Sequence, residues 1–292
     1  MNTIWKCLLL LGFAFVVLGG CASRGIPPAS VTREQSEARA VLMKSAEAHG
    51  LQAWQQIRDI NVSYAGEWRS LVGRLQPTLI DGGYRQASEE RLILGGQPII
   101  AQQHRGPVGN KQVLRSVQDV QVRYDRAPST DRDVLAAAAL VADGYRMFLT
   151  GPFLFMTGNE RLERLEPETV EGRSCDVLLA VRRPGHGLSA EDRYLLFIDQ
   201  ENGLVRRLRF SLDGLASTQG AIAEVDFFDH REIAGVLWPT RFFERLRKPI
   251  PNLPVHDWRL LGLDVNRGIT AAEISGPEFS GKASPPARRL EN

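Results

Sequence analysis

The sequence has few cysteines and almost no net charge. Its 292 residues include three cysteines, and 36 Lys and Arg stand against 34 Asp and Glu. Because the charges nearly cancel, no overall field favours nucleic acid or another polyanion as a partner. Cys7 lies in the uncharged N-terminal run described below, and Cys21 lies shortly after it. Cys175 is the one cysteine in the rest of the chain. An intramolecular disulfide is therefore not expected, and stability must come from the hydrophobic core.

Motifs that carry enzyme or cofactor chemistry are also missing. The chain has no H-E-x-x-H, no C-x-x-C, no Walker glycine loop and no G-x-S-x-G elbow, and its five histidines have no metal-ligand spacing. His256 and Asp257 are adjacent and would point to opposite faces of a strand, which argues against a catalytic pair. Cys175 alternates with Val177 and Leu179 and is expected in the core. We expect no enzyme activity, metal or cofactor, although catalytic groups need only meet in space.

A run of twelve uncharged residues, 7–18, follows a single positive charge at the N-terminus. As a helix it would span about 18 Å, too short for the ~30 Å core of a bilayer but typical of a signal peptide. We expect no later stretch to be long and apolar enough to span a bilayer. Leu18-Gly19-Gly20-Cys21 follows the run and resembles the lipobox of bacterial lipoproteins. The resemblance implies cleavage of residues 1–20, attachment of acyl chains such as palmitate to Cys21 and, with Ala22 next, an anchor on the periplasmic face of the outer membrane.

A tether, one domain and a tail are expected after the cleavage point. Residues 21–31 are rich in Pro and small side chains and are interpreted as a flexible tether. Residues 32–275 contain no linker rich enough in Pro, Gly or charge to divide them, so we expect a single domain. Residues 276–292, which contain one Pro-Pro and one Arg-Arg pair, are expected to be disordered.

Two segments have helical spacing. Thr32 and Gln35 have capping-box form, and the apolar face that follows ends at His49-Gly50, so a helix is expected there, with a short second helix around Trp54. Residues 131–149 place their apolar side chains on one helical face, and Gly-Pro directly after them ends that helix.

The remaining sequence alternates with the period of β-strands. From Ile60 to Trp68 apolar side chains alternate with polar ones, which is typical of an antiparallel strand with one wet face. The Asn202-Gly203 pair predicts a hairpin turn. The acidic pairs Glu89-Glu90 and Asp226 with Asp229 are interpreted as solvated strand faces. Further antiparallel strands are expected near 91–94, 99–104, 112–117, 120–124, 175–181, 194–198, 204–212, 222–232, 236–246 and 255–265.

The strand after the Asn-Gly turn carries an arginine on a face that is otherwise apolar. By alternation Arg206 shares a face with Leu204, Leu208 and Phe210, whereas Val205 lies on the other face. An arginine buried without a partner is costly. We therefore expect Arg206 to reach the rim, to meet a carboxylate, or to face an anionic or carbonyl-bearing ligand.

Three short motifs stand out from this pattern. They are Ala48-His49-Gly50 followed by Trp54 and Ile57, the hairpin 195–207, and the segment 228–240 with its Gly-Val-Leu-Trp-Pro-Thr ending. Together they are similar to motifs of the lipoprotein-localisation superfamily, the LolA/LolB-like half-barrels. The resemblance implies a mainly β fold with a few helices: a curved antiparallel sheet of roughly eleven strands that forms an incomplete barrel closed by helices. Relatives of known function hold acyl chains in the apolar concavity.

The leading hypothesis is a membrane-anchored periplasmic lipoprotein that binds a lipid or a lipoprotein acyl chain in envelope trafficking. One alternative is a structural or assembly lipoprotein that binds a protein partner and no ligand, and another is a hydrolase. A hollow apolar cavity would favour the first, a filled core with a large exposed apolar patch the second, and a buried His–carboxylate pair in a cleft the third. The candidate cavity or lid residues are Trp68, Phe148, Phe153, Phe155, Met156, Arg206, Leu208 and Phe210.

Overall fold

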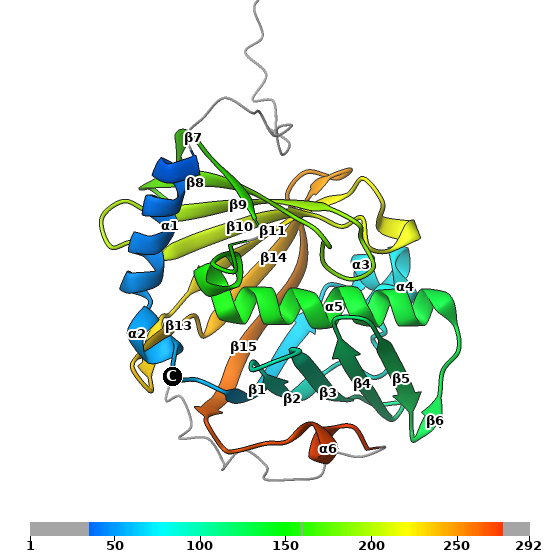
Figure 1. The fold of residues 1–292 in the computed structure, drawn as a ribbon. Coiled ribbons are helices and arrows are strands. Elements are labelled where there is room, and N and C mark those ends of the chain that lie inside the picture. Colours follow the sequence, from blue (N-terminus) through cyan, green and yellow to red (C-terminus); the bar gives the residue numbers. More distant parts are fainter. Residues whose placement is uncertain (1–34, 159, 277–292) are drawn as a thin grey trace, which may run out of the picture.

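The computed structural model describes residues 35–158 and 160–276 (Figure 1). The signal peptide, Cys21, the tether, the predicted cap at Thr32 and residues 277–292 lie outside this range, so they stay predictions. The helices and 3-10 turns are α1 (Gln35–Ala48), α2 (Leu51–Trp54), α3 (Ser70–Leu75), α4 (Pro77–Ile80), α5 (Arg132–Thr150), η1 (Gly151–Phe155), η2 (Ala216–Thr218) and α6 (Ala271–Ile274).

One large antiparallel sheet dominates the described residues. Its thirteen strands run in the order β6-β5-β4-β3-β2-β1-β15-β14-β11-β10-β9-β8-β7, and the sheet is curved but not closed into a barrel (Figure 1). The predicted fold class is therefore confirmed, with thirteen strands rather than roughly eleven. The strands are β1 (Asp59–Trp68), β2 (Ala87–Ile93), β3 (Ile99–Arg105), β4 (Asn110–Ser116), β5 (Val120–Tyr124), β6 (Ala127–Pro128), β7 (Arg161–Val170), β8 (Arg173–Arg182), β9 (Asp192–Asp199), β10 (Val205–Ser211), β11 (Ile222–Phe228), β14 (Arg241–Lys248) and β15 (Leu253–Val265); β12 (Arg231–Ile233) and β13 (Val236–Trp238) form a separate hairpin.

Helix α5 lies across the concave side of the sheet (Figure 1). The side chain of Asp131 caps its first turn by accepting hydrogen bonds from two backbone N–H groups, and Gly151 with φ of +52° ends it. Small buried side chains, among them Ala138 and Ala142, let the helix lie close to β3, β4 and β5. The helix predicted at 131–149 is confirmed, and it covers much of the apolar inner face.

The same helix, counted with η1 as Arg132–Phe155, is long and apolar enough to cross a membrane by length and composition alone. The expectation that no segment after the signal peptide meets this criterion is therefore wrong. However, 67% of its most apolar window is buried inside the molecule. The apolar composition is explained by this burial, because a helix surrounded by the inner face of a sheet is apolar on most sides.

The three motifs that carry the family resemblance meet at one junction. His49, directly after α1, donates a hydrogen bond from Nδ1 to the carbonyl of Leu237 at 3.0 Å, and its Nε2 accepts one from the backbone N–H of Val205 at 3.1 Å. Burial lowers the pKa of His49 to about 4, so the ring stays neutral. A Cβ on Gly50 would lie 2.2 Å from the carbonyl oxygen of Gly235, so no larger residue fits. These motifs join α1 to β10 and β13, which gives them a role in folding.

Strand alternation fails at one place in β10. The pairing of β10 with β9 shifts register between Val205 and Arg207, so Arg206 is the extra residue of a β-bulge. Val205 consequently lies in the main core together with Leu208 and Phe210. The prediction that Val205 faces the opposite side is wrong, because a bulge resets the alternation of side chains.

Two acidic residues expected on solvated faces are buried instead. Glu90 lies on the inner face of β2 and accepts a hydrogen bond from Gln102 at 2.8 Å. Asp226 on the outer face of β11 pairs with Arg207 and Arg245 from the two neighbouring strands. Polar side chains are buried here because neighbouring strands supply their partners, which the sequence of a single strand does not reveal.

Asp143 fastens α5 within the concavity. Its Oδ2 accepts hydrogen bonds from Arg115 of β4 at 3.0 and 3.2 Å and from the backbone N–H of Gly187 at 2.9 Å. Arg115 also donates to the carbonyl of Gly187 at 2.8 Å, and all three residues are buried. Strand β4 belongs to one half of the sheet and Gly187 to the β8–β9 loop of the other half. One carboxylate therefore joins the helix to both halves.

We expect Asp143→Ala to lower the free energy of unfolding by about 3–5 kcal/mol, because Arg115 would be left buried without its counter-charge. Asp133→Ala, in the exposed first turn of the same helix, is the matched control and should cost less than about 1 kcal/mol. Urea denaturation followed by circular dichroism measures both losses. Equal losses in the two variants would show that Asp143 contributes no more than a surface charge.

Candidate functional site

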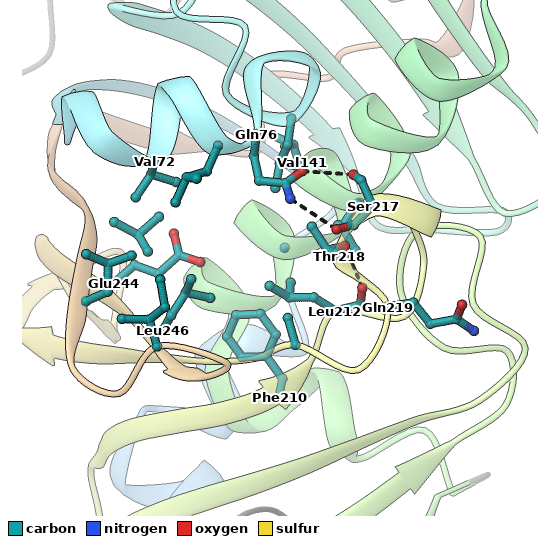
Figure 2. Close-up of a pocket in the computed structure, with 18 of the residues that line it drawn as sticks. Val72, Gln76, Val141, Phe210, Leu212, Ser217, Thr218, Gln219, Glu244 and Leu246 are labelled. Atoms are coloured by element: carbon teal, nitrogen blue, oxygen red, sulfur yellow. Dashed lines mark hydrogen bonds between the residues drawn. The ribbon is translucent and has the colours of Figure 1, made fainter.

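A cavity of about 440 Å³ lies between the helices and the inner face of the sheet. Its walls come from α3, α4 and α5 and from β10, β14 and β15 (Figure 2). The strongly curved sheet needs side chains, helices or a ligand against its inner face, and here α5 does not fill the space. The main apolar lining residues are Val72, Leu79, Leu140, Val141, Phe148, Phe210, Leu212, Leu246, Leu253 and Val255.

Exposed apolar side chains mark the mouth of the cavity. Leu75 at the end of α3 and Ile250 in the β14–β15 loop both line the cavity, and they are 52% and 44% exposed. Gln76 and Ser217 exchange two hydrogen bonds, of 3.0 and 2.8 Å, that connect the α3–α4 segment to η2 (Figure 2). The mouth is therefore apolar and is braced by a polar contact between two loops.

Glu244 of β14 is the one acidic side chain among the described residues that line the cavity. Figure 2 shows its carboxylate pointing toward the other lining residues. It has no hydrogen bond or ion pair with any residue in the described part of the chain. Burial raises the pKa of Glu244 to about 7, and the nearby charge of Arg85 opposes this rise only in part. The carboxyl group therefore titrates near neutral pH.

Stacked aromatic rings lie beside Glu244. Trp68, His256, Trp258 and Phe242 stack in that order, with 3.8, 4.4 and 4.9 Å between successive ring centroids. In the strand register Glu244 is paired directly with His256. Burial and the charge of the nearby arginine hold the pKa of His256 well below its ordinary value, so the ring is neutral. His256, the cross-strand neighbour of Glu244, is therefore held in the ring stack and carries no positive charge that could pair with the carboxylate.

His186 also lines the cavity, and it forms a buried pair with Asp192. Its Nδ1 lies 3.1 Å from the Asp192 carboxylate and 3.1 Å from the Tyr194 hydroxyl. Burial would raise the pKa of Asp192, but hydrogen bonds from His186 and Ser211 hold it below its ordinary value. Nε2 of His186 has no hydrogen-bond partner among the described residues. The side of the ring that faces away from Asp192 is therefore buried without a protein partner.

Three of the eight predicted cavity or lid residues line this cavity, namely Trp68, Phe148 and Phe210. They come from β1, α5 and β10, so the fold brings together side chains that are distant in sequence. Leu208 faces the same side of the sheet but is buried in the main core. Met156 is partly buried and packs against that core.

The two phenylalanines of η1 lie outside the cavity lining. Phe153 stacks on Trp54 with 4.4 Å between ring centroids. Phe155 is fully buried, and its ring centroid lies 5.2 Å from that of Tyr194. Both rings therefore pack within the core between α1, α2 and the sheet.

Arg206 also lies outside the lining and has a carboxylate partner. Its Nε donates to Oδ2 of Asp199 at 3.0 Å, and Asp199 is bonded to Arg173 as well. Among the alternatives considered for Arg206, the structure has the internal carboxylate partner. The bulge at this position turns the side chain toward Asp199.

Glu244, His186 and Asp192 were not among the sequence candidates. Alternation does place Glu244 on the same face as Phe242 and Leu246, and this is the one local signal that could have identified it. His186 lies in a Pro-Gly-His-Gly loop, and its partner comes from the following strand. In the described ranges no group of three or more His, Cys, Asp or Glu residues is placed to hold a metal ion.

The backbone of this chain is similar to several solved structures. No protein-family model and no curated protein matches the chain. A LolA superfamily protein from Nitrosomonas europaea is 13% identical, over 82% of this chain and 97% of its own, with a TM-score of 0.49. A DUF1329 family protein from Desulfovibrio piger is 12% identical, over 83% of this chain and 99% of its own, with a TM-score of 0.49. The likeness concerns the fold and identifies no ligand.

The raised pKa of Glu244 predicts a pH-dependent stability. Because the folded pKa of about 7 exceeds the ordinary value of 4.5, ionisation opposes folding, and the cost appears as the pH rises between these values. Glu244→Gln should therefore raise the free energy of unfolding by about 1–3 kcal/mol at pH 8 and change it little at pH 4. Urea denaturation at the two pH values tests this, and an effect of equal size at both would contradict it.

Proposed function

We propose that this protein is a membrane-anchored lipoprotein of the bacterial envelope that binds a hydrophobic or amphiphilic ligand, such as a lipid or a lipoprotein acyl chain. The observation that carries the proposal is the apolar cavity of about 440 Å³. This volume lies in the range of roughly 300–1,000 Å³ that is usual for small-molecule sites. A hollow inner face favours ligand binding over a purely structural role, for which a filled core would suffice.

The apolar mouth supports the same function. A ligand with an acyl chain must leave a bilayer or another protein, and exposed side chains such as Leu75 and Ile250 keep its chain in apolar contact on the way. An anchor at Cys21 would hold the domain near the membrane that supplies such ligands. Attachment to the outer membrane, on its periplasmic face, and a part in lipid or lipoprotein trafficking belong to this proposal.

A hydrolase is the second candidate, and the His186–Asp192 pair is the observation that favours it. A histidine whose Nδ1 is held by a buried carboxylate can act as a general base through Nε2. Yet no hydroxyl or thiol group in the described residues donates to this Nε2, so an activated nucleophile is missing and water would have to serve. Cleavage of an acyl ester that is lost in His186→Gln would support this candidate.

Gly144 of α5 offers a way to fill the cavity without changing the sheet. It lines the cavity, and a Cβ there would meet the Phe148 ring at 3.6 and 3.7 Å, which is ordinary contact. Gly144→Leu should weaken binding of an environment-sensitive apolar dye about tenfold or more, because the new side chain occupies the cavity. Fluorescence titration of the purified full chain, with displacement by a long-chain alcohol, measures this binding.

Gly144→Ala is the matched control for this experiment. It makes the same backbone change, removes a glycine from a helix interior and should stabilise the protein slightly. The alanine variant is expected to bind the dye as the wild type does. Undiminished binding by Gly144→Leu, or no saturable binding by the wild type, would contradict the proposed site.

The anchor is tested by Cys21→Ser. The substitution should abolish lipidation, because the serine hydroxyl does not replace the thiol that receives the lipid, and should leave a retained precursor or a released protein. Metabolic labelling with a palmitate analogue in the host bacterium measures this, with Cys175→Ser as the control that keeps its label. Label that persists on Cys21→Ser would exclude lipid attachment at this cysteine.

A further inference from the structure

The cavity also restricts the polar end of its ligand, an inference that rests on the proposed binding function. We propose that the cavity selects amphiphiles whose polar end donates hydrogen bonds, an alcohol, an amide or an ammonium group, and rejects those that end in an anion. The selecting group is Glu244.

Three polar side chains of the lining, Gln76, Ser217 and Thr218, already donate hydrogen bonds to protein groups. Gln76 donates to the carbonyl of Ser217, and the hydroxyl of Ser217 donates to Gln76 in return (Figure 2). The hydroxyl of Thr218 lies 2.7 Å from the carbonyl of Leu212, to which it donates. The hydrogen bonds that these three side chains make compete with an anionic head group, which needs several donors at once.

Glu244 is the one charged acceptor among the described residues of the lining. Its carboxylate has no hydrogen bond or ion pair within the described ranges. An acceptor in an apolar cavity costs free energy unless a donor reaches it. A hydroxyl, amide or ammonium group supplies that donor. A carboxylate or phosphate would instead place a second negative charge beside Glu244, where the apolar walls screen the repulsion poorly.

No cation among the described residues forms an ion pair with Glu244. Arg85 is the charged residue that acts on it, but its guanidinium lies 4.5 Å from the centroid of the Trp68 ring and donates to a backbone carbonyl at 3.0 Å. No ion pair joins Arg85 to Glu244 in the part of the chain that the structure describes. The other titratable groups around the carboxyl group are His256 on β15 and Tyr145 on α5, and burial keeps both uncharged. The positive charge that Glu244 lacks can therefore come from a ligand.

Three probes with the same twelve-carbon chain test the selection: dodecanol, dodecylammonium and dodecanoate. Each competes with the apolar dye for the purified full chain at pH 8, below its micelle-forming concentration. We expect dodecylammonium to displace the dye at a concentration about tenfold or more below that of dodecanoate, because Glu244 attracts the first and repels the second. Dodecanol, which donates one hydrogen bond without charge, should lie between them.

Glu244→Gln should remove the difference between the two charged probes, because the amide is neutral and both donates and accepts. Glu67→Gln is the matched control: it removes the same charge from an exposed position on β1 of the same sheet, and it should keep the wild-type order. This pair of variants separates a local effect in the cavity from the effect of net charge.

The outcomes are distinct. Equal displacement by the two charged probes in the wild type, or stronger displacement by dodecanoate, would overturn the selection. A wild-type order in Glu244→Gln would overturn the role of Glu244. Absence of dye binding and of binding by all three probes would contradict the proposed function itself, whereas binding of dodecanol without any charge preference would contradict the selection alone.

Discussion

The position of helix α5 inside an open sheet is the constraint on which the rest of the structure depends. A curved sheet that does not close leaves an apolar inner face that strands alone cannot cover. Helix α5 covers it with small side chains, and Asp143 fixes the helix through Arg115 on one half of the sheet and Gly187 on the other. One buried carboxylate therefore joins three elements and holds the helix to both halves of the sheet, beside the cavity.

The chemistry of that space follows from the strands that face it. Alternation puts Phe210 and Leu246 on the inner face, which makes the wall apolar. The same alternation puts Glu244 there, beside a stacked and neutral His256, so its charge has no protein partner. A wall of this composition suits an apolar chain that ends in a hydrogen-bond donor, and the apolar mouth suits transfer from a membrane.

The sequence could predict what depends on local periodicity. The helix at 131–149 and the alternating strands follow from spacing. The half-barrel class follows from the family resemblance of three motifs, which the structure joins at His49. The features that the sequence could not predict depend on contacts with residues of other strands and helices. Arg206 sits in a bulge that only the pairing with β9 reveals, and Glu90 is buried because Gln102 comes from the next strand. The sequence around Glu244 does not distinguish it from a solvent-exposed strand glutamate, because the cavity that it lines is formed by helix α5 and distant strands.

The central claim is that the cavity holds an amphiphile in the cell, and native mass spectrometry of the protein purified from its bacterium tests it most directly. Wild-type protein should carry a non-covalent adduct of lipid mass that collisional activation removes. The same preparation of Gly144→Leu, whose new side chain takes up part of the cavity, should carry much less of that adduct. A wild-type protein without any adduct, or an adduct of equal abundance in both proteins, would contradict the account.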